Sequence, residues 1–283
     1  MDNKLLTTQL DPIMPRPLSS ETDNIVHLNR LMRMTRDSVI ITRRNLTKYR
    51  RVPSLLVFST IQPIMFLLLF TYVFGGAVKG VGGSYVNFLV PGILIQAVTF
   101  GCTQTGVGLA DDMQKGMMDR FRSLPMARSA VLAGRTLSDS LRNFFVVVLM
   151  IGVGYIIGFR FQAGIVPGIA AMLIAVGFGF SLTWVSALVG LYAKDAESAG
   201  VLQFIWIFPL TFASSAFVPI ATMPGWLQAF ARVNPISNAV LCLRALSNGG
   251  PTLDYLIYTL MWIFITTLIA SSLAVTLFRR RSR

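Results

Sequence analysis

Charged residues are scarce in this chain of 283 residues: they make up 13% of it, while hydrophobic residues make up 54%. Soluble domains carry about a quarter charged residues, so the composition excludes an ordinary soluble protein. Lys and Arg outnumber Asp and Glu by 25 to 12. A basic chain can bind nucleic acid, but here the basic residues flank long uncharged runs. That placement favours a membrane protein with no nucleic-acid partner.

Residues that build metal centres, disulfides and nucleophilic sites are almost missing. The chain has one histidine, His27, and two cysteines, Cys102 and Cys242, too few for a metal-ligand cluster or a disulfide framework. No Gly-Lys pair occurs, which excludes the phosphate-binding motif G-x-x-x-x-G-K-[ST]. We therefore expect a chain that is not an enzyme and binds no metal or cofactor of its own.

The sequence does contain six runs without any Asp, Glu, Lys or Arg. Each is about long enough to cross ~30 Å of hydrocarbon as a helix, and helices satisfy their own backbone hydrogen bonds in lipid. We predict an all-α integral membrane domain at 53–283 with six transmembrane helices. Their expected positions are 54–74, 85–107, 143–159, 167–190, 201–220 and 253–278.

The basic residues are distributed unequally between the two sides of these spans. Of the 25 Lys and Arg residues, 21 lie before the first span, between the second and third, between the fourth and fifth, or after the sixth. The positive-inside rule then places both termini in the cytoplasm.

No charged residue lies deep within a predicted span. Carriers driven by ion or proton gradients usually need buried ionisable groups, so we expect the energy for any transport to come from elsewhere.

The segment before the first span has two parts. Residues 1–23 are rich in proline and polar residues, which predicts a disordered cytoplasmic tail. Residues 24–52 form a basic amphipathic pattern, which predicts an interface helix that lies on anionic membrane lipids. Basic residues that only set the topology are the alternative.

The connection at 110–142 is the longest on the cytoplasmic side. Asp111 and Asp112 suit the N-terminus of a helix, which Pro125 would end. A second amphipathic helix is expected from Arg128 into the third span. Large apolar residues share one face of the first helix: Met113, Met117, Phe121 and Leu124. Such a face either folds back on the protein's own helices or docks into a partner.

On the other side, the connection at 221–250 is long enough for two half-helices. Pro235 begins the second, and Trp226 suits the membrane interface. We expect an outer re-entrant element, with a plain surface loop as the alternative.

Polar residues inside the spans also have two explanations, because they either line a path or bridge helices. They are Gln96, Thr99 and Thr103, which share one face of the second span with Gly92 and Gly106, together with Gln62 and Gln203. Small residues are expected to allow close helix packing. These are Gly154 and Gly158 in the third span and Gly179, Thr183, Ser186 and Gly190 in the fourth.

Two motifs and the six-span plan together resemble the permeases of type-2 ABC exporters, especially the daunorubicin-resistance branch. The first motif is DRFRSLPMA at 119–127. The second combines FVP at 217–219, MPGWL at 223–227 and VNPI at 233–236. With the basic helix before the first span, the resemblance covers about residues 25–280.

The resemblance implies the permease subunit of an ATP-driven exporter in a bacterial plasma (inner) membrane. Its cargo would be a hydrophobic or amphipathic compound, such as a drug, an antibiotic-like metabolite or a lipid. Two permease chains, expected as a homodimer, would work with two copies of a separate ATP-binding subunit, which holds ATP and Mg. Spans 1, 2 and 5 would surround the dimer axis. The alternatives are an ATP-independent carrier or channel and a membrane scaffold that transports nothing.

The resemblance also assigns roles to residues. The helix of the 110–142 connection, at about 112–124, would be the coupling helix that docks into the ATP-binding subunit. Its coupling residues would be Met113, Met117, Asp119, Arg120, Phe121, Arg122, Leu124 and Pro125. The outer re-entrant element would include Pro224, Trp226, Phe230, Asn234 and Pro235.

Overall fold

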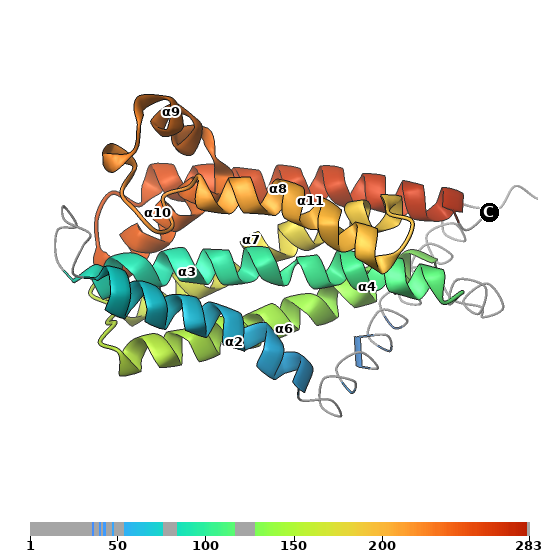
Figure 1. The fold of residues 1–283 in the computed structure, drawn as a ribbon, viewed down its shortest axis with the longest axis horizontal. Coiled ribbons are helices and arrows are strands. Elements are labelled where there is room, and N and C mark those ends of the chain that lie inside the picture. Colours follow the sequence, from blue (N-terminus) through green and yellow to red (C-terminus); the bar gives the residue numbers. More distant parts are fainter. Residues whose placement is uncertain are drawn as a thin grey trace, which may run out of the picture.

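The computed structural model describes residues 36, 40, 42–43, 47, 54–75, 84–116 and 128–281. These residues are helical apart from the connections between helices, and they include no strand. The long helices run side by side along the longest axis of the molecule (Figure 1). This confirms the prediction of an all-α protein. The predicted tail at 1–23 and nearly all of the predicted helix at 24–52 lie outside the described residues.

The helices follow one another through short connections. Their bounds are α2 (Ser54–Leu69), the π-helix η1 (Phe70–Phe74), α3 (Tyr85–Gly101), α4 (Thr103–Gln114), α6 (Arg128–Ile156), α7 (Ile165–Tyr192), α8 (Ala196–Phe212), the 3-10 helix η2 (Ile220–Thr222), α9 (Gly225–Val233), α10 (Pro235–Asn248) and α11 (Leu253–Arg281).

Four helical stretches are long and apolar enough to cross a membrane. They are Tyr85–Gln114, Leu132–Ile156, Ile165–Tyr192 and Leu253–Phe278. Two shorter apolar helices, Thr60–Val73 and Ala196–Phe212, stand at the places of the predicted first and fifth spans. The protein is therefore a multi-pass membrane protein, and the count of six spans stays a prediction.

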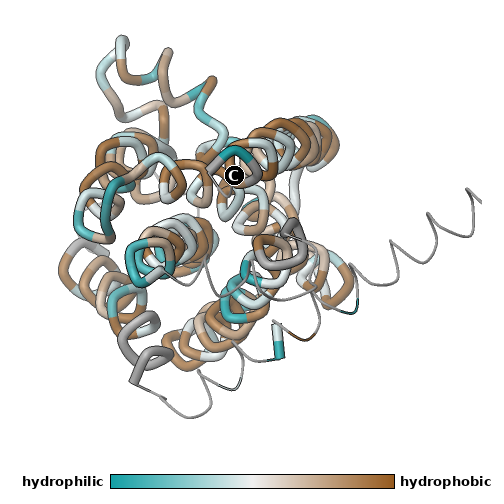
Figure 2. The backbone as a smooth tube through the Cα atoms, turned by 90° about the vertical axis from the view of Figure 1, so that its right-hand side faces the viewer, coloured by the Kyte–Doolittle hydropathy of each residue, from teal (hydrophilic) through white to brown (hydrophobic). Residues whose placement is uncertain are grey.

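The bundle has two ends, which we name after helices that lie there (Figure 1). At the α4 end, α4, α7 and α11 finish and α6 and α8 begin. At the α9 end, α6 and α8 finish, α3, α7 and α11 begin, and α9 and α10 fill the stretch between α8 and α11. Figure 2 views the molecule from the side that carries the C-terminus and shows the segment with α9 standing away from the other helices. Near the α4 end, Thr42 Oγ1 donates a hydrogen bond of 3.1 Å to the Gly134 carbonyl, so part of the predicted interface helix contacts α6.

Helix α7 lies at the centre of the packing, because it contacts α3, α4, α6, α8, α10 and α11. Its small residues let these helices approach closely. A Cβ atom at Gly179 would lie 2.9 Å from Val98 Cβ, and one at Gly190 would lie 2.2 Å from the Gly106 carbonyl oxygen. Ser186 donates or accepts at the same crossing. The predicted small-residue packing face of the fourth span is confirmed.

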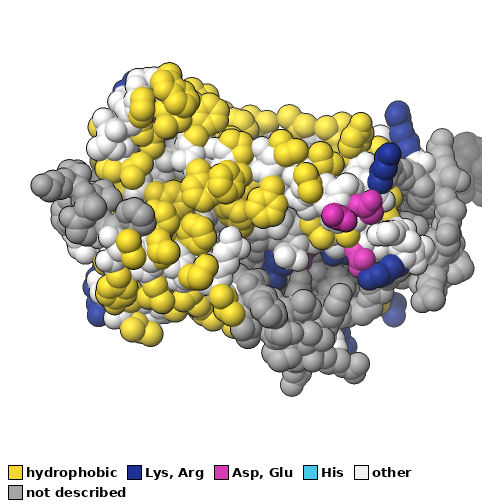
Figure 3. All heavy atoms as spheres, viewed as in Figure 1, with side chains coloured by type: hydrophobic (Ala, Val, Ile, Leu, Met, Phe, Trp, Pro, Cys, Tyr) yellow, Lys and Arg dark blue, Asp and Glu magenta, His cyan; other side chains and the backbone are white. Residues whose placement is uncertain are grey.

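The outer surface is apolar along most of the bundle. Only 11% of the apolar window of α11 is buried, so nearly all of it faces outward. In Figure 3, hydrophobic side chains cover most of the visible face, and charged side chains gather toward the α4 end. An apolar surface of this extent is costly in water and suits lipid.

A proline inside α3 is compensated by a residue far away in the sequence. Pro91 has no N–H, so the Asn87 carbonyl lacks its usual helical donor. Asn248 Nδ2, at the end of α10, donates to this carbonyl at 3.1 Å. Helix α10 is thereby attached to the first turns of α3, and the two helices also pack together.

Three expectations are wrong. The third span begins earlier than residue 143, because α6 is continuous from Arg128 and contains Asp139 and Arg142. These charges are neutralised by contacts with each other and with α4, so they do not end the helix. The fifth span ends at Phe212, soon after Pro209, and not at residue 220. Gly158 lies beyond α6 with φ of 102°, so it serves a turn and not helix packing; Gly154 does pack, against Val90.

Candidate functional site

The helix formed by α3 and α4 is interrupted at Cys102. In a regular helix the Gly101 carbonyl would accept from the Thr105 amide. Here the Thr105 amide donates to the Cys102 carbonyl at 3.0 Å, and the Gly106 amide donates to Ser186 Oγ of α7 at 3.0 Å. The Gly101 carbonyl is therefore left to accept from a side chain. We call residues 101–106 the helix break.

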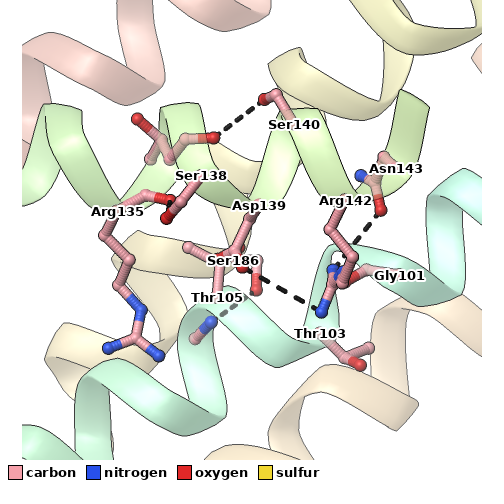
Figure 4. Close-up of polar contacts among 12 residues, drawn as sticks. Gly101, Thr103, Thr105, Arg135, Ser138, Asp139, Ser140, Arg142, Asn143 and Ser186 are labelled. Atoms are coloured by element: carbon pink, nitrogen blue, oxygen red, sulfur yellow. Dashed lines mark hydrogen bonds and ion pairs between the residues drawn. The ribbon is translucent and has the colours of Figure 1, made fainter. Parts of the chain in front are cut away.

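Two charged side chains of α6 reach the helix break (Figure 4). Arg142 Nη2 donates to the Gly101 carbonyl at 2.5 Å and to Asn143 Oδ1 at 3.3 Å. Asp139 Oδ2 accepts from Thr105 Oγ1 at 2.6 Å, and its other oxygen lies 4.0 Å from Arg142 Nη1. Asp139 and Arg142 are only 3% and 4% exposed. Burial of charges is tolerated here because each one has a partner.

A third link joins the same two helices nearer the α4 end. Arg135 of α6 forms an ion pair with Asp112 of α4. Arg135, Asp139 and Arg142 are spaced four and three residues apart, which places them on one face of α6. Their partners at 112, 105 and 101 follow in the opposite direction along α4 and the end of α3. We call these three links the α4–α6 ladder.

Helices α7 and α8 close the other side of the helix break. Gln203 Nε2 donates to the Ser186 carbonyl at 3.0 Å and to Ser186 Oγ at 2.9 Å. Gln203 Oε1 accepts from Trp206 Nε1 at 3.1 Å. Because the Gln203 amide is buried and bonded on both its nitrogen and its oxygen, it bridges helices in this conformation.

The other predicted path-lining residues have different surroundings. Gln96 and Thr99 are buried, and Thr99 Oγ1 donates to the Ile95 carbonyl of its own helix at 2.7 Å. Thr103 is half-buried and Gln62 is exposed. The described residues therefore do not gather these side chains into one lining, and their role in a path stays a proposal.

Of the predicted coupling residues, Met113 alone lies in the described part of the chain. It is half-buried and packs against a cluster that includes Leu109, Leu132 and Trp184. Met113 thus contributes to the chain's own packing at the α4 end. The remaining coupling residues, Met117, Asp119, Arg120, Phe121, Arg122, Leu124 and Pro125, lie outside the described residues.

The start predicted for the coupling helix is wrong. Asp111 and Asp112 lie in the last turn of α4, which ends at Gln114 and is followed by Gly116 with φ of 65°. Acidic residues at a helix C-terminus are unfavourable, but both have cationic partners, because Lys115 Nζ donates to Asp111 at 2.6 Å and Arg135 pairs with Asp112. The hydrogen bond with Asp111 raises the pKa of Lys115.

The predicted outer element consists of two unlike helices. Pro224 is the N-cap of α9, and Trp226 and Phe230 of α9 are 75% and 44% exposed, as an interfacial helix requires. Asn234 is buried. Its Oδ1 caps α10 by accepting from the Ile236 amide at 2.9 Å, while its Nδ2 donates to the Leu210 carbonyl at 2.7 Å.

Pro235 is the first residue of α10, where its fixed φ suits a helix start. Helix α10 itself packs against α3, α7 and α11. One half-helix therefore lies at the surface, and the other enters the bundle.

Arg244 of α10 is a functional candidate that the sequence reasoning missed. It is 9% exposed, and its guanidinium carbon lies 3.5 Å from the centre of the Phe88 ring. Arg244 Nε donates to the Phe88 carbonyl at 2.9 Å, and Nη2 donates to the carbonyls of Ser215 and Ala216 at 2.7 and 3.1 Å. Arg244 therefore joins α10 to α3 and to the segment after α8.

Comparison with known proteins gives consistent matches. Residues 37–247 match the ABC-2 type transporter family. The chain is 36% identical over 236 residues to the daunorubicin resistance ABC transporter permease protein DrrB1 of Streptomyces coeruleorubidus, covering 82% of this chain and 83% of that protein.

Two further relatives extend the comparison. The doxorubicin resistance ABC transporter permease protein DrrB of Mycobacterium tuberculosis is 31% identical over 253 residues, covering 82% of this chain and 88% of that protein. The putative transport permease ycf38 of Cyanophora paradoxa is 26% identical over 214 residues, covering 73% and 72%. The family match includes the helix break, the α4–α6 ladder and Arg244.

Proposed function

The chain belongs to the ABC-2 type transporter family as a permease, and we propose that it is the membrane subunit of an ATP-driven exporter in a bacterial plasma membrane. Its cargo would be a hydrophobic or amphipathic compound, such as a drug, an antibiotic-like metabolite or a lipid. The family match over residues 37–247 carries this proposal. Relatives named for daunorubicin and doxorubicin resistance support the choice of cargo class.

The energy would enter through a separate subunit. This chain contains no Gly-Lys pair and so no phosphate-binding loop of the G-x-x-x-x-G-K-[ST] kind. Two copies of an ATP-binding subunit would hold ATP and Mg. ATP binding would draw them together, and they would push on the coupling segment between α4 and α6 of each permease chain.

The orientation places the α4 end in the cytoplasm. The charged groups of Asp111, Asp112, Lys115 and Arg135 meet there, and Lys194 lies in the connection between α7 and α8 at the same end. Basic residues next to the ends of spans favour the cytoplasmic side. The α9 end, with exposed Trp226, would then face outward, and six helices would cross the membrane.

A second permease chain would complete the exporter, expected as an identical copy. The exposed apolar residues of α2 and α8 are compatible with such a contact. They include Ile61, Met65 and Leu68 on α2, and Val201, Phe204 and Ile205 on α8.

The proposal is tested by reconstituting the chain with the ATP-binding protein encoded beside it in inside-out membrane vesicles. We expect ATP-dependent uptake of the fluorescent drug daunorubicin into the vesicles. Vesicles in which the ATP-binding protein lacks its phosphate-loop lysine are the matched control and should take up none. Uptake that is the same in both vesicle types would contradict an ATP-driven exporter.

One observation favours the alternative of an ATP-independent carrier, namely the buried carboxylate of Asp139. That carboxylate is already held by Thr105 and lies beside Arg142, so it is not free to exchange protons with water. Vesicles that contain the permease alone, energised by an imposed proton gradient, separate the two functions. A carrier would transport under these conditions, and an ATP-driven exporter would not.

A further inference from the structure

The α4–α6 ladder differs from ordinary helix packing because it fixes the register of two antiparallel helices. Apolar side chains can slide past one another at little cost, but a charged group that leaves its partner in an apolar bundle loses far more. Asp139 and Arg142 are almost fully buried. Helices α4 and α6 are therefore held against sliding at three levels, by Asp112 with Arg135, Thr105 with Asp139 and Gly101 with Arg142.

The ladder also connects two places that differ in stiffness. At one end it reaches Asp112, next to the segment 117–127, where the coupling residues are predicted. At the other end it reaches the helix break, where the backbone amides of Thr105 and Gly106 have left the regular helical pattern. Interrupted hydrogen-bond ladders are where helices bend.

From this juxtaposition we propose that Arg135, Asp139 and Arg142 are positioning residues that make α4 and α6 one rigid lever. The lever carries movement of the 117–127 segment to the helix break, where α4 turns relative to α3. This inference rests on the proposed function, since it assumes that an ATP-binding subunit moves the segment. It adds the route by which that movement enters the membrane domain.

The test uses variants that disconnect the helices without leaving a buried charge unpaired. The double variant Asp139→Leu/Arg142→Met removes both charges together, which often preserves folding. Thr105→Val removes one link at nearly constant volume, and it decides the question if the double variant does not reach the membrane. Ser140→Ala is the matched control, because Ser140 is buried on the same helix and its hydroxyl donates only to the Thr136 carbonyl of α6.

Three quantities are measured in vesicles with the full exporter: co-purification of the ATP-binding subunit, ATP hydrolysis and drug uptake. For the double variant we expect normal co-purification, ATP hydrolysis within about twofold of wild type and uptake reduced about tenfold. Ser140→Ala should leave all three unchanged. Uptake that falls only in proportion to ATP hydrolysis, or does not fall, would overturn the lever.

The wild-type arm keeps this inference separate from the proposed function. If wild-type vesicles show no ATP-dependent uptake, the proposed function fails. If they do show it and the double variant keeps the same uptake per ATP hydrolysed, the lever alone fails.

Discussion

Three buried charged side chains, Asp139, Arg142 and Arg244, show how single residues are accommodated in this bundle. Each one bonds to groups that the backbone or a neighbouring helix leaves without a partner. Arg142 serves the Gly101 carbonyl at the helix break, and Arg244 serves the carbonyls of Ser215 and Ala216 after the end of α8. The burial cost of the charge is offset by these hydrogen bonds.

Replacement of Arg244 with methionine should destabilise the protein. Methionine keeps much of the apolar volume but leaves the carbonyls of Phe88, Ser215 and Ala216 short of a donor, which costs about 3 kcal/mol in total. The free energy of unfolding in detergent measures the loss. Arg232→Met is the control, because Arg232 is exposed on α9 and its removal should change stability little. Equal stability of both variants would show that the three carbonyl contacts contribute nothing.

Buried charges of this kind are hard to predict from sequence alone. The partners of Arg244 are backbone carbonyls up to 156 residues away, and a carbonyl leaves no mark in the sequence. The α4–α6 ladder does leave a weak signal, because Arg135, Asp139 and Arg142 recur at helical spacing. That signal is lost when every charged residue is assigned to a loop.

At the scale of elements, apolar runs located most helices correctly. The predicted fourth and sixth spans match α7 and α11 to within a few residues, because their charges lie only at their ends. The prediction was wrong for the start of α6 and the start of the coupling helix, where charged residues are paired inside a helix. Tertiary contacts decide such positions, and composition does not.

The N-terminus of α8 offers a prediction at this scale. Asp195 caps the helix: its Oδ1 accepts from the Ser198 amide at 2.7 Å, and the Ser198 hydroxyl contacts the Asp195 amide in return. The Ser198 amide lowers the pKa of Asp195. A lowered pKa means that the cap stabilises the fold above the ordinary pKa of aspartate and loses this contribution as the pH falls through the lowered value.

We therefore expect Asp195→Ala to lower Tm near neutral pH, with a difference from wild type that shrinks toward zero in acid. Thermal unfolding across a pH series measures it. Asp195→Asn retains a capping oxygen that does not titrate, so its Tm should depend less on pH than that of wild type. A difference between wild type and Asp195→Ala that stays constant down to strongly acidic pH would contradict the role of the carboxylate.

For the whole molecule, the prediction concerns which end of the bundle faces the cytoplasm. Cysteines introduced by Trp226→Cys and Lys115→Cys lie at opposite ends, and both native side chains are exposed. The native thiols Cys102 and Cys242 are free but buried, so they should react little. In intact cells, a membrane-impermeant maleimide should label the position at 226 and spare the one at 115 until the membrane is opened. Reversed labelling would invert the proposed orientation.

The hydrogen bond between Asn248 and the Asn87 carbonyl has a consequence for how the protein is made. The two residues are 161 positions apart, and ribosomes add about 5–20 residues per second. The proline-interrupted turn of α3 therefore exists for roughly 10–30 s before its missing donor has been synthesised. During that interval the nascent chain holds an incomplete helix, and any quality-control factor that recognises exposed backbone has its opportunity before α10 emerges.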